Sequence, residues 1–183
     1  MLISSPGSVY HSPVGFPINA LTHRTSIDSY LTMTVKHYTY KSPVGTIMIE
    51  ADDDGLMALR FSDEDYSSEI GINNVISQTI AWLDDYFSGK VPAFTPPLKF
   101  AATDFRQKVW RCLQSVPYGS TVSYSYIAKL LHSSPRAVGG AIARNPIAII
   151  IPCHRVIGSN GAMTGYAWGL ERKRFLLSLE NQR

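Results

Sequence analysis

Apolar and polar side chains alternate along three short stretches in the first half of the chain, and this period of two predicts β-strands. The stretches run from Val35 to Tyr40, from Thr46 to Ala51 and from Leu56 to Phe61, with turn-forming residues between them at 42–45 and 53–55. Because both connections are short, we expect a small antiparallel sheet. The aspartates at 52–54 are interpreted as a solvated loop and not as a cation site.

A helical period replaces this alternation further along the chain. Apolar residues recur three or four positions apart at Val75, Ile76, Ile80, Leu83 and Phe87. This spacing predicts an amphipathic helix over Asn74–Phe87 that ends at Gly89 and covers one face of the sheet. No residue in this half is a candidate for chemistry.

The second half of the chain is predicted to be mainly helical. The expected helices run from Asp104 to Ser115, from Tyr124 to Leu131 and from Pro135 onward. Thr103 is typical of the residue before a helix, as is Ser123, and proline is favoured in a first helical turn. Two short helices joined by a tight turn indicate a helix-turn-helix, although this signal is weak alone.

The last of these helices is rich in small side chains, over residues 136–144. Its two interior glycines, Gly139 and Gly140, each cost roughly 1 kcal/mol relative to alanine. Such a cost indicates that another backbone comes close. The neighbour is either a packed helix of the same chain or a nucleic acid, with Arg136 at the leading end.

Charge divides the chain near Pro96 and Pro97. From Lys99 onward there are twelve Lys and Arg against three Asp and Glu, whereas residues 1–98 carry five against eleven. The basic half is either a solvated face or a surface for a polyanion such as nucleic acid. We expect a flexible extension at 1–32, with Met33 as an alternative start, a small domain at 33–97 and a helix-turn-helix domain at 98–183.

Composition excludes several classes of protein. The two cysteines have different surroundings and do not form a disulfide framework, which favours a reducing, cytoplasmic setting, or the nucleus in a eukaryote. The chain contains no CxxC or HExxH motif, so we expect neither a metal site nor a cofactor. The sequence also predicts no secretory signal and no membrane partner, because no apolar stretch is long enough to span a bilayer.

Cys153 and His154 are neighbours within Ile151-Pro152-Cys153-His154-Arg155-Val156, directly after an apolar run. A lone cysteine is more often a small core residue, and this is our interpretation of Cys112. Around Cys153 the polar His154 and Arg155 favour the other interpretation, a nucleophilic thiol beside an imidazole base. Assuming extended backbone, the two side chains would point to opposite faces and would communicate through a water.

A longer set of residues resembles the alkylguanine DNA alkyltransferases, or methylated-DNA protein-cysteine methyltransferases. The set comprises Ser123-Tyr124, the run 136–141, Asn145-Pro146, the hexapeptide around Cys153, and Gly165-Tyr166. The resemblance implies an α+β fold, with a small ribonuclease H-like sheet-and-helix domain followed by a winged-helix-like DNA-binding domain. It also implies direct repair of double-stranded DNA that contains alkylated guanine, by a monomer without a cofactor.

The resemblance further implies roles for individual residues. Cys153 accepts the alkyl group, His154 acts as the base, Glu180 orients His154, Asn145 braces the thiol loop, and Tyr124 lies against the target nucleotide. The DNA-contacting residues would be Tyr124, Arg136, Ala137, Gly139, Gly140 and Arg144, with Arg136 replacing the flipped base and the small residues entering the minor groove. The substrate pocket would be lined by Cys153, Val156, Tyr166, Ala167 and Trp168.

The chemistry fits a thiol. A thiolate displaces an alkyl carbon from O6 of guanine in line, and the thioether product cannot regenerate the cysteine, so each molecule acts once. The bulk of Trp168 predicts a preference for methyl and other small groups, and acceptance of O4-alkylthymine stays open. Two alternatives from other classes are a Cys-His hydrolase, which turns over, and a DNA-binding regulator that needs no thiol.

Overall fold

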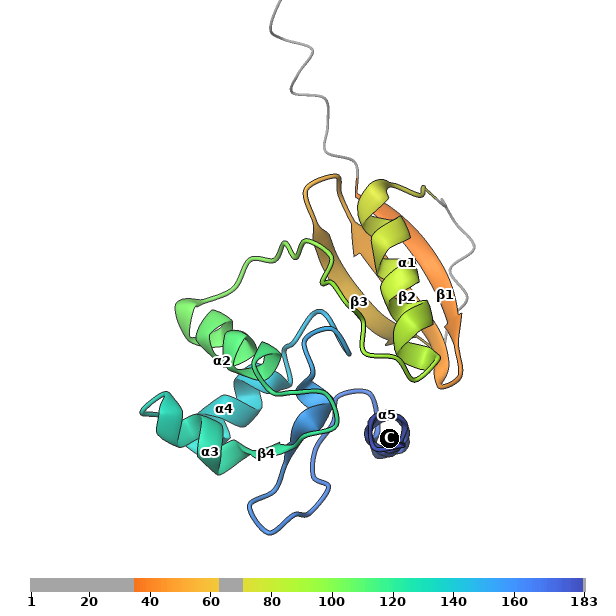
Figure 1. Ribbon diagram of the computed structural model, residues 1–183. Coiled ribbons are helices and arrows are strands. Elements are labelled where there is room, and N and C mark those ends of the chain that lie inside the picture. Colours follow the sequence, from red (N-terminus) through yellow and green to blue (C-terminus); the bar gives the residue numbers. More distant parts are fainter. Residues whose placement is uncertain (1–34, 63–70, 183) are drawn as a thin grey trace, which may run out of the picture. The chain divides into compact units, whose positions relative to one another are not determined.

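The computed structural model describes residues 35–62 and 71–182, and its first part is a three-stranded antiparallel sheet (Figure 1). The strands are β1 (Lys36–Ser42), β2 (Gly45–Ala51) and β3 (Leu56–Ser62), in the order β1-β2-β3. The predicted strands and turns are therefore confirmed. The expected extension at 1–32 lies outside the described residues.

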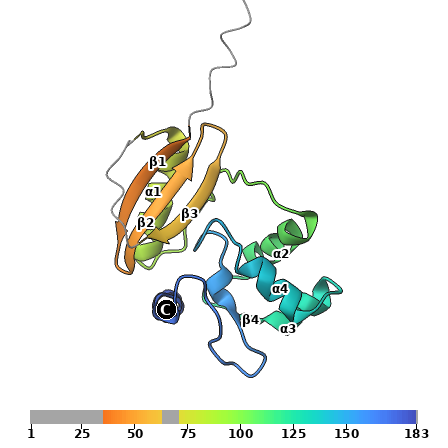
Figure 2. The same cartoon turned by 180° about the vertical axis from the view of Figure 1, so that it is seen from behind.

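Helix α1 (Asn74–Phe87) covers one face of this sheet, in front of it in Figure 1 and behind it in Figure 2. Asn73 caps its start, because its side-chain oxygen accepts a hydrogen bond from the Ile76 amide at 2.9 Å. The helix ends at Phe87 and is followed by the cap residue Ser88 and by Gly89. The φ of Gly89 is +82°, which suits glycine. The predicted helix and its bounds are confirmed. Val75, Ile76 and Leu83 of its predicted apolar face are buried, and Ile80 and Phe87 are partly buried.

The second part consists of short helices and a two-stranded parallel pair. Its elements are α2 (Asp104–Gln114), β4 (Val122–Ser123), α3 (Tyr124–Leu130), α4 (Pro135–Ile142), the 3-10 helix η1 (Cys153–Arg155), β5 (Val156–Ile157) and α5 (Leu170–Glu180). β4 pairs with β5. The side chains of Ser123 and Ser134 cap α3 and α4 by accepting backbone hydrogen bonds at 3.0 and 3.2 Å. These caps fix the start of each helix of the predicted pair.

Helix α5 has no counterpart in the sequence-based expectation. Its buried positions are Lys173, Leu176, Leu177 and Glu180, which follow helical spacing but include two charged residues. The two charged residues interrupt the apolar period at the buried positions, so the hydrophobic pattern alone does not reveal this helix.

Strand β3 connects the two parts through its outer edge. The Leu59 amide donates to the Pro146 carbonyl at 2.9 Å, and the Leu59 carbonyl accepts from the Ala148 amide at 2.8 Å. Leu56 makes similar bonds to Pro97 and Lys99, at 2.7 and 2.8 Å. The segment that leads to Cys153 is thus hydrogen-bonded to the sheet, and one hydrophobic core runs through both parts.

The interpretation of residues 52–54 as a solvated loop is wrong for Asp52. Its side chain is buried, accepts from the Asp54 and Gly55 amides at 3.0 Å each, and pairs with Lys99 at 2.6 Å. The hydrogen bond from Lys99 and those from the two amides lower the pKa of Asp52 although burial opposes them. Asp52 therefore closes the turn before β3.

Within the described residues no helix is long and apolar enough to cross a membrane.

Candidate active site

Cys153 begins η1 at the end of a buried segment, residues 147–151. Ile149 in this segment has a φ of +66°, a conformation that β-branched residues rarely adopt and that costs on the order of 1–3 kcal/mol. The expectation of extended backbone at Cys153 and His154 is wrong, because the chain forms a 3-10 turn there. The turn lets both side chains be buried, at 4% and 0% exposure, in different surroundings.

Asn145 holds the thiol loop. Its amide nitrogen donates to the Ile151 carbonyl at 2.8 Å and to the Cys153 sulfur at 3.1 Å, and its oxygen accepts from the Ile147 amide at 3.0 Å. Burial raises the pKa of the Cys153 thiol, while Asn145, Lys173 and other groups only partly oppose it. The resting side chain is therefore a protonated thiol, and its reaction requires a base.

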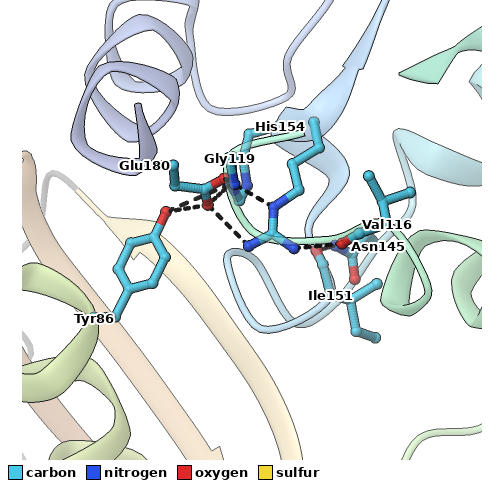
Figure 3. A network of polar contacts seen from close by, with 8 residues as sticks. Tyr86, Val116, Gly119, Asn145, Ile151, His154 and Glu180 are labelled. Carbon is cyan, nitrogen blue, oxygen red and sulfur yellow. Dashed lines mark hydrogen bonds and ion pairs between the residues drawn. The ribbon is translucent and has the colours of Figure 1, made fainter. Parts of the chain in front are cut away.

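A hydrogen-bonded network around Glu180 fixes His154 (Figure 3). His154 Nε2 lies 2.7 Å from Glu180 Oε1, and Tyr86 donates to the same oxygen at 2.8 Å. Arg155 donates to both carboxylate oxygens, at 2.9 and 3.0 Å, and the Gly119 amide donates to Oε2 at 3.1 Å. The carboxylate thus accepts hydrogen bonds from four residues in three separate segments: Tyr86 on α1, the loop at Gly119, and His154 and Arg155 in η1.

The protonation states in this network follow from burial and charge. Burial lowers the pKa of His154 although Glu180 opposes it, so the imidazole is neutral. Burial acts to raise the pKa of Glu180, but hydrogen bonds from His154 and Arg155 outweigh it and bring that pKa to about 2. Because Nε2 donates to an ionised carboxylate, Nδ1 is the basic nitrogen. None of the described residues forms a hydrogen bond with it.

Cys153 opens onto a cavity of about 470 Å³. The lining residues are Tyr124, Ser125, Pro135, Gly139, Ile142, Ala143, Asn145, Cys153, Ser159, Thr164, Gly165, Tyr166, Ala167 and Trp168. Of the five predicted pocket residues, Cys153, Tyr166, Ala167 and Trp168 line this cavity. Val156 does not, because it is fully buried in β5 against β4.

Three aromatic side chains shape the cavity wall. The Tyr124 hydroxyl donates to the Gly165 carbonyl at 3.3 Å, which ties α3 to the loop before α5. Burial raises the pKa of Tyr166 well above its usual value, and the neighbouring Cys153 raises it further. Trp168 packs against Phe61 of β3, with ring centroids 6.1 Å apart. The wall is therefore supported from the sheet.

Of the residues predicted to contact DNA, Tyr124 begins α3, and the others lie on α4 or just after it. Arg136, Ala137 and Arg144 are exposed. A Cβ at Gly139 would lie 3.8 Å from the Tyr124 ring, and one at Gly140 would lie 3.6 Å from Arg144, both ordinary contacts. Among the described residues no backbone approaches these glycines, so packing within the chain does not explain them.

Three residues of the hydrogen-bond networks around the site were not predicted from the sequence. Tyr86 lies in the half in which no chemistry was expected, yet its hydroxyl donates to Glu180 beside His154 at 2.8 Å. Arg155 was assigned no partner, yet it binds Glu180 and donates to the Val116 carbonyl at 2.7 Å. Lys173 is buried and donates to the Val156 and Thr164 carbonyls at 2.5 and 3.0 Å, which connects β5 to the cavity loop. The signal that could have identified Arg155 and Lys173 is that charged residues stand there among positions that are buried.

The described residues contain no group of three or more His, Cys, Asp and Glu side chains arranged to hold a metal ion.

Two family models match the chain. The model described as 6-O-methylguanine DNA methyltransferase, ribonuclease-like domain, matches residues 35–100. The model described as 6-O-methylguanine DNA methyltransferase, DNA binding domain, matches residues 104–182. Together they cover most of the chain.

Individual relatives agree with these models. A methylated-DNA–protein-cysteine methyltransferase of Methanosarcina acetivorans is 42% identical over 148 residues, which is 77% of this chain and 95% of the relative. One of Mycobacterium leprae is 42% identical over 76% of this chain and 88% of the relative. The crystal structure of Mycobacterium tuberculosis O6-methylguanine methyltransferase superposes with a TM-score of 0.73 at 40% identity, over 82% of this chain and 94% of that one. The structure of Mycobacterium tuberculosis OGT in complex with DNA gives the same TM-score and identity, over 80% and 93%.

Proposed function

Because the chain belongs to the 6-O-methylguanine DNA methyltransferase family, we propose that it repairs DNA by moving an alkyl group from O6 of guanine to Cys153. The transfer is direct and uses each molecule once. The predicted fold class, α+β with a ribonuclease-like part and a DNA-binding part, agrees with both family models.

The observation that carries this proposal is that Cys153 lines a cavity and that the residue directly after it carries a buried, neutral imidazole. Asn145 donates to the sulfur at 3.1 Å, and His154 next to it is anchored on Glu180 at 2.7 Å. The cavity of about 470 Å³ is lined by Tyr124, Tyr166 and Trp168. A soft nucleophile, a base and a cavity with aromatic walls together suit alkyl transfer from a purine.

The proposed reaction proceeds by in-line displacement at the alkyl carbon. The thiol proton passes to Nδ1 of His154 through a water, and the imidazolium is stabilised by Glu180. The sulfur electron pair forms the S–C bond while the C–O6 bond breaks. The released electron pair is delocalised into the purine ring, which takes up a proton and leaves as guanine. The thioether carries no ionisable proton and is a poor leaving group, so Cys153 is not regenerated.

The target base has to leave the duplex to reach this cavity, because the thiol is nearly buried. Flipping costs a few kcal/mol and is least costly for a poorly paired, damaged base. We propose that α4 enters the minor groove with Ala137, Gly139 and Gly140 against the DNA, and that Arg136 fills the space left by the base. Arg144 adds charge on the same side, and phosphate contacts without sequence readout supply most of the affinity.

The finer assignments belong to the same proposal. We place the domain boundary between residues 97 and 98, and the protein as a monomer in the compartment that holds the DNA, the cytoplasm or a eukaryotic nucleus. The free thiol of Cys153 suits such a reducing compartment. O4-alkylthymine is the further substrate to test, since it presents a similar alkyl ether.

Intact-mass analysis after mixing with a duplex that contains O6-methylguanine tests the proposal. We expect one methyl group per molecule, on the peptide that contains Cys153. Cys153→Ser should gain none, whereas Cys112→Ser, a matched change at the other free cysteine, should behave as wild type. Turnover without a gain in mass would instead indicate a hydrolase, and site-specific binding without transfer would indicate a regulator.

A further inference from the structure

Tyr86 brings a hydroxyl from the sheet-and-helix part of the chain into the network around His154. It lies on α1, 94 residues before Glu180 and 68 before His154, and its side chain is fully buried. Its oxygen is 2.8 Å from Glu180 Oε1 and 3.4 Å from His154 Nε2. The sequence marks Tyr86 only as a position near the end of an amphipathic helix, but the fold places it beside the base (Figure 3).

The geometry at Glu180 Oε1 makes the hydroxyl a competitor of His154. This oxygen receives His154 Nε2 at 2.7 Å, Tyr86 at 2.8 Å and an Arg155 nitrogen at 3.0 Å. A carboxylate oxygen offers about two lone-pair directions, so three donors exceed its preferred capacity. Each donor that draws on the charge of Oε1 weakens the hold of this oxygen on the other two.

We propose that Tyr86 is a positioning residue that limits how strongly Glu180 stabilises a protonated His154. The His154–Glu180 bond has to orient the ring and keep the proton on Nε2, yet it must not make the resting imidazole take up a second proton. Because Tyr86 shares Oε1, the bond can orient the ring without causing the resting imidazole to take up a second proton. This inference rests on the proposed function, because it concerns the base of the same reaction.

The other charged and titratable groups around His154 come from two elements. They are Arg155 on η1, the element that also contains Cys153, and Lys173 and Glu180 on α5. Arg155 and Lys173 oppose protonation of His154 by their charge, and burial opposes it most. Tyr118 packs edge-on against the Tyr86 ring, with centroids 5.9 Å apart, and carries the Arg155 guanidinium over its face at 5.6 Å. Glu180 is therefore the group that favours protonation, and Tyr86 acts on it directly.

Tyr86→Phe removes the hydroxyl and keeps the packed ring. The acid limb of the pH profile of methyl transfer should then shift to higher pH, because Glu180 now favours the imidazolium more strongly. Below the new midpoint the rate should drop by up to about tenfold relative to wild type, the effect of one lost hydrogen bond to a charged group. The rate at alkaline pH should change little.

Tyr40→Phe is the matched control. Tyr40 also donates to a carboxylate on α1, Asp84 at 2.7 Å, but at an exposed position away from the cavity. Its loss should leave the pH profile in place. Site-specific 3,5-difluorotyrosine at position 86 gives a test of opposite sign, because the more acidic hydroxyl is a stronger donor to Glu180 and should move the acid side to lower pH.

NMR titration of the His154 imidazole in DNA-free protein supplies a readout that does not depend on methyl transfer. The His154 pKa should rise in Tyr86→Phe and stay unchanged in Tyr40→Phe. An unshifted imidazole titration and pH profile in folded Tyr86→Phe, even with a uniformly lower rate, would overturn the inference. Failure of wild type to acquire a methyl group would instead refute the proposed function, and the NMR result would still decide the role of Tyr86.

Discussion

Folding stability should depend on pH through Glu180, the buried carboxylate that receives five hydrogen bonds. Although burial opposes ionisation, hydrogen bonds from His154 and Arg155 lower its pKa from the usual 4.5 to about 2. A carboxylate whose pKa is lower in the folded chain stabilises the fold above the unfolded value and loses that effect as the pH falls through the folded value. The relevant window therefore runs from about pH 4.5 down to about pH 2, and the full effect is on the order of 3 kcal/mol.

Glu180→Gln removes this dependence while keeping the shape of the side chain. At neutral pH the variant should be less stable by roughly 3–5 kcal/mol, because Arg155 is left buried without its carboxylate. On acidification the wild type takes up a proton at Glu180 and loses stability, whereas the variant does not. The difference should therefore shrink, by about 1.4 kcal/mol at about pH 3.5. Urea unfolding at neutral and acid pH, followed by circular dichroism, measures it.

Glu171→Gln is the control for this measurement. Glu171 lies on the same helix but is exposed, and it pairs with Arg174 at the surface. Its replacement should change stability by less than about 1 kcal/mol at either pH. If the difference between wild type and Glu180→Gln stayed constant from neutral pH to about pH 3.5, the assignment of Glu180 as a strongly stabilised carboxylate would be wrong.

Three further predictions concern the cavity and its surroundings. Asn145→Ala leaves the Ile147 amide without its partner, removes one of the two donors to the Ile151 carbonyl, and should cost roughly 2–4 kcal/mol in urea unfolding; a loss below about 1 kcal/mol would contradict the bracing role. Trp168→Gly opens the cavity wall and should speed inactivation by O6-benzylguanine by about tenfold or more, the scale of relieved overpacking, whereas unchanged rates would refute the size argument. Arg136→Ala should slow transfer from duplex DNA by about tenfold or more but leave transfer from free O6-methylguanine unchanged, because only the duplex requires flipping; equal losses on both substrates would show a different role.

The sequence was sufficient for the elements whose own side chains carry a period. The alternation in 35–61 predicts β1 to β3, and the spacing from Val75 to Phe87 predicts α1 with its observed bounds. Helix α5 escaped because Lys173 and Glu180 occupy buried positions where an apolar period would place hydrophobic residues. Their partners, two carbonyls and a network of donors, lie between 9 and 94 residues away in sequence.

The candidate site was predictable where neighbours in sequence are also neighbours in space. Asn145, Cys153 and His154 lie within ten residues, and the structure brings Asn145 into hydrogen-bond contact with the Cys153 sulfur. The backbone at Cys153 was expected to be extended and is a 3-10 turn, because hydrogen bonds of the preceding loop, not local propensity, determine it. Tyr86 was also missed because its position depends on contacts between distant segments: only the packing of α1 shows where its hydroxyl points.

The pairing of Leu59 with Pro146 and Ala148 also restricts how this gene can be rearranged. A recombinant that exchanged the first hundred codons for those of an unrelated sheet would have to restore this edge in register, or the polar backbone before Cys153 would lose its partners. Chimeras between relatives should therefore keep this edge and its partner segment from the same parent, and should be cut elsewhere, for example in exposed surface turns.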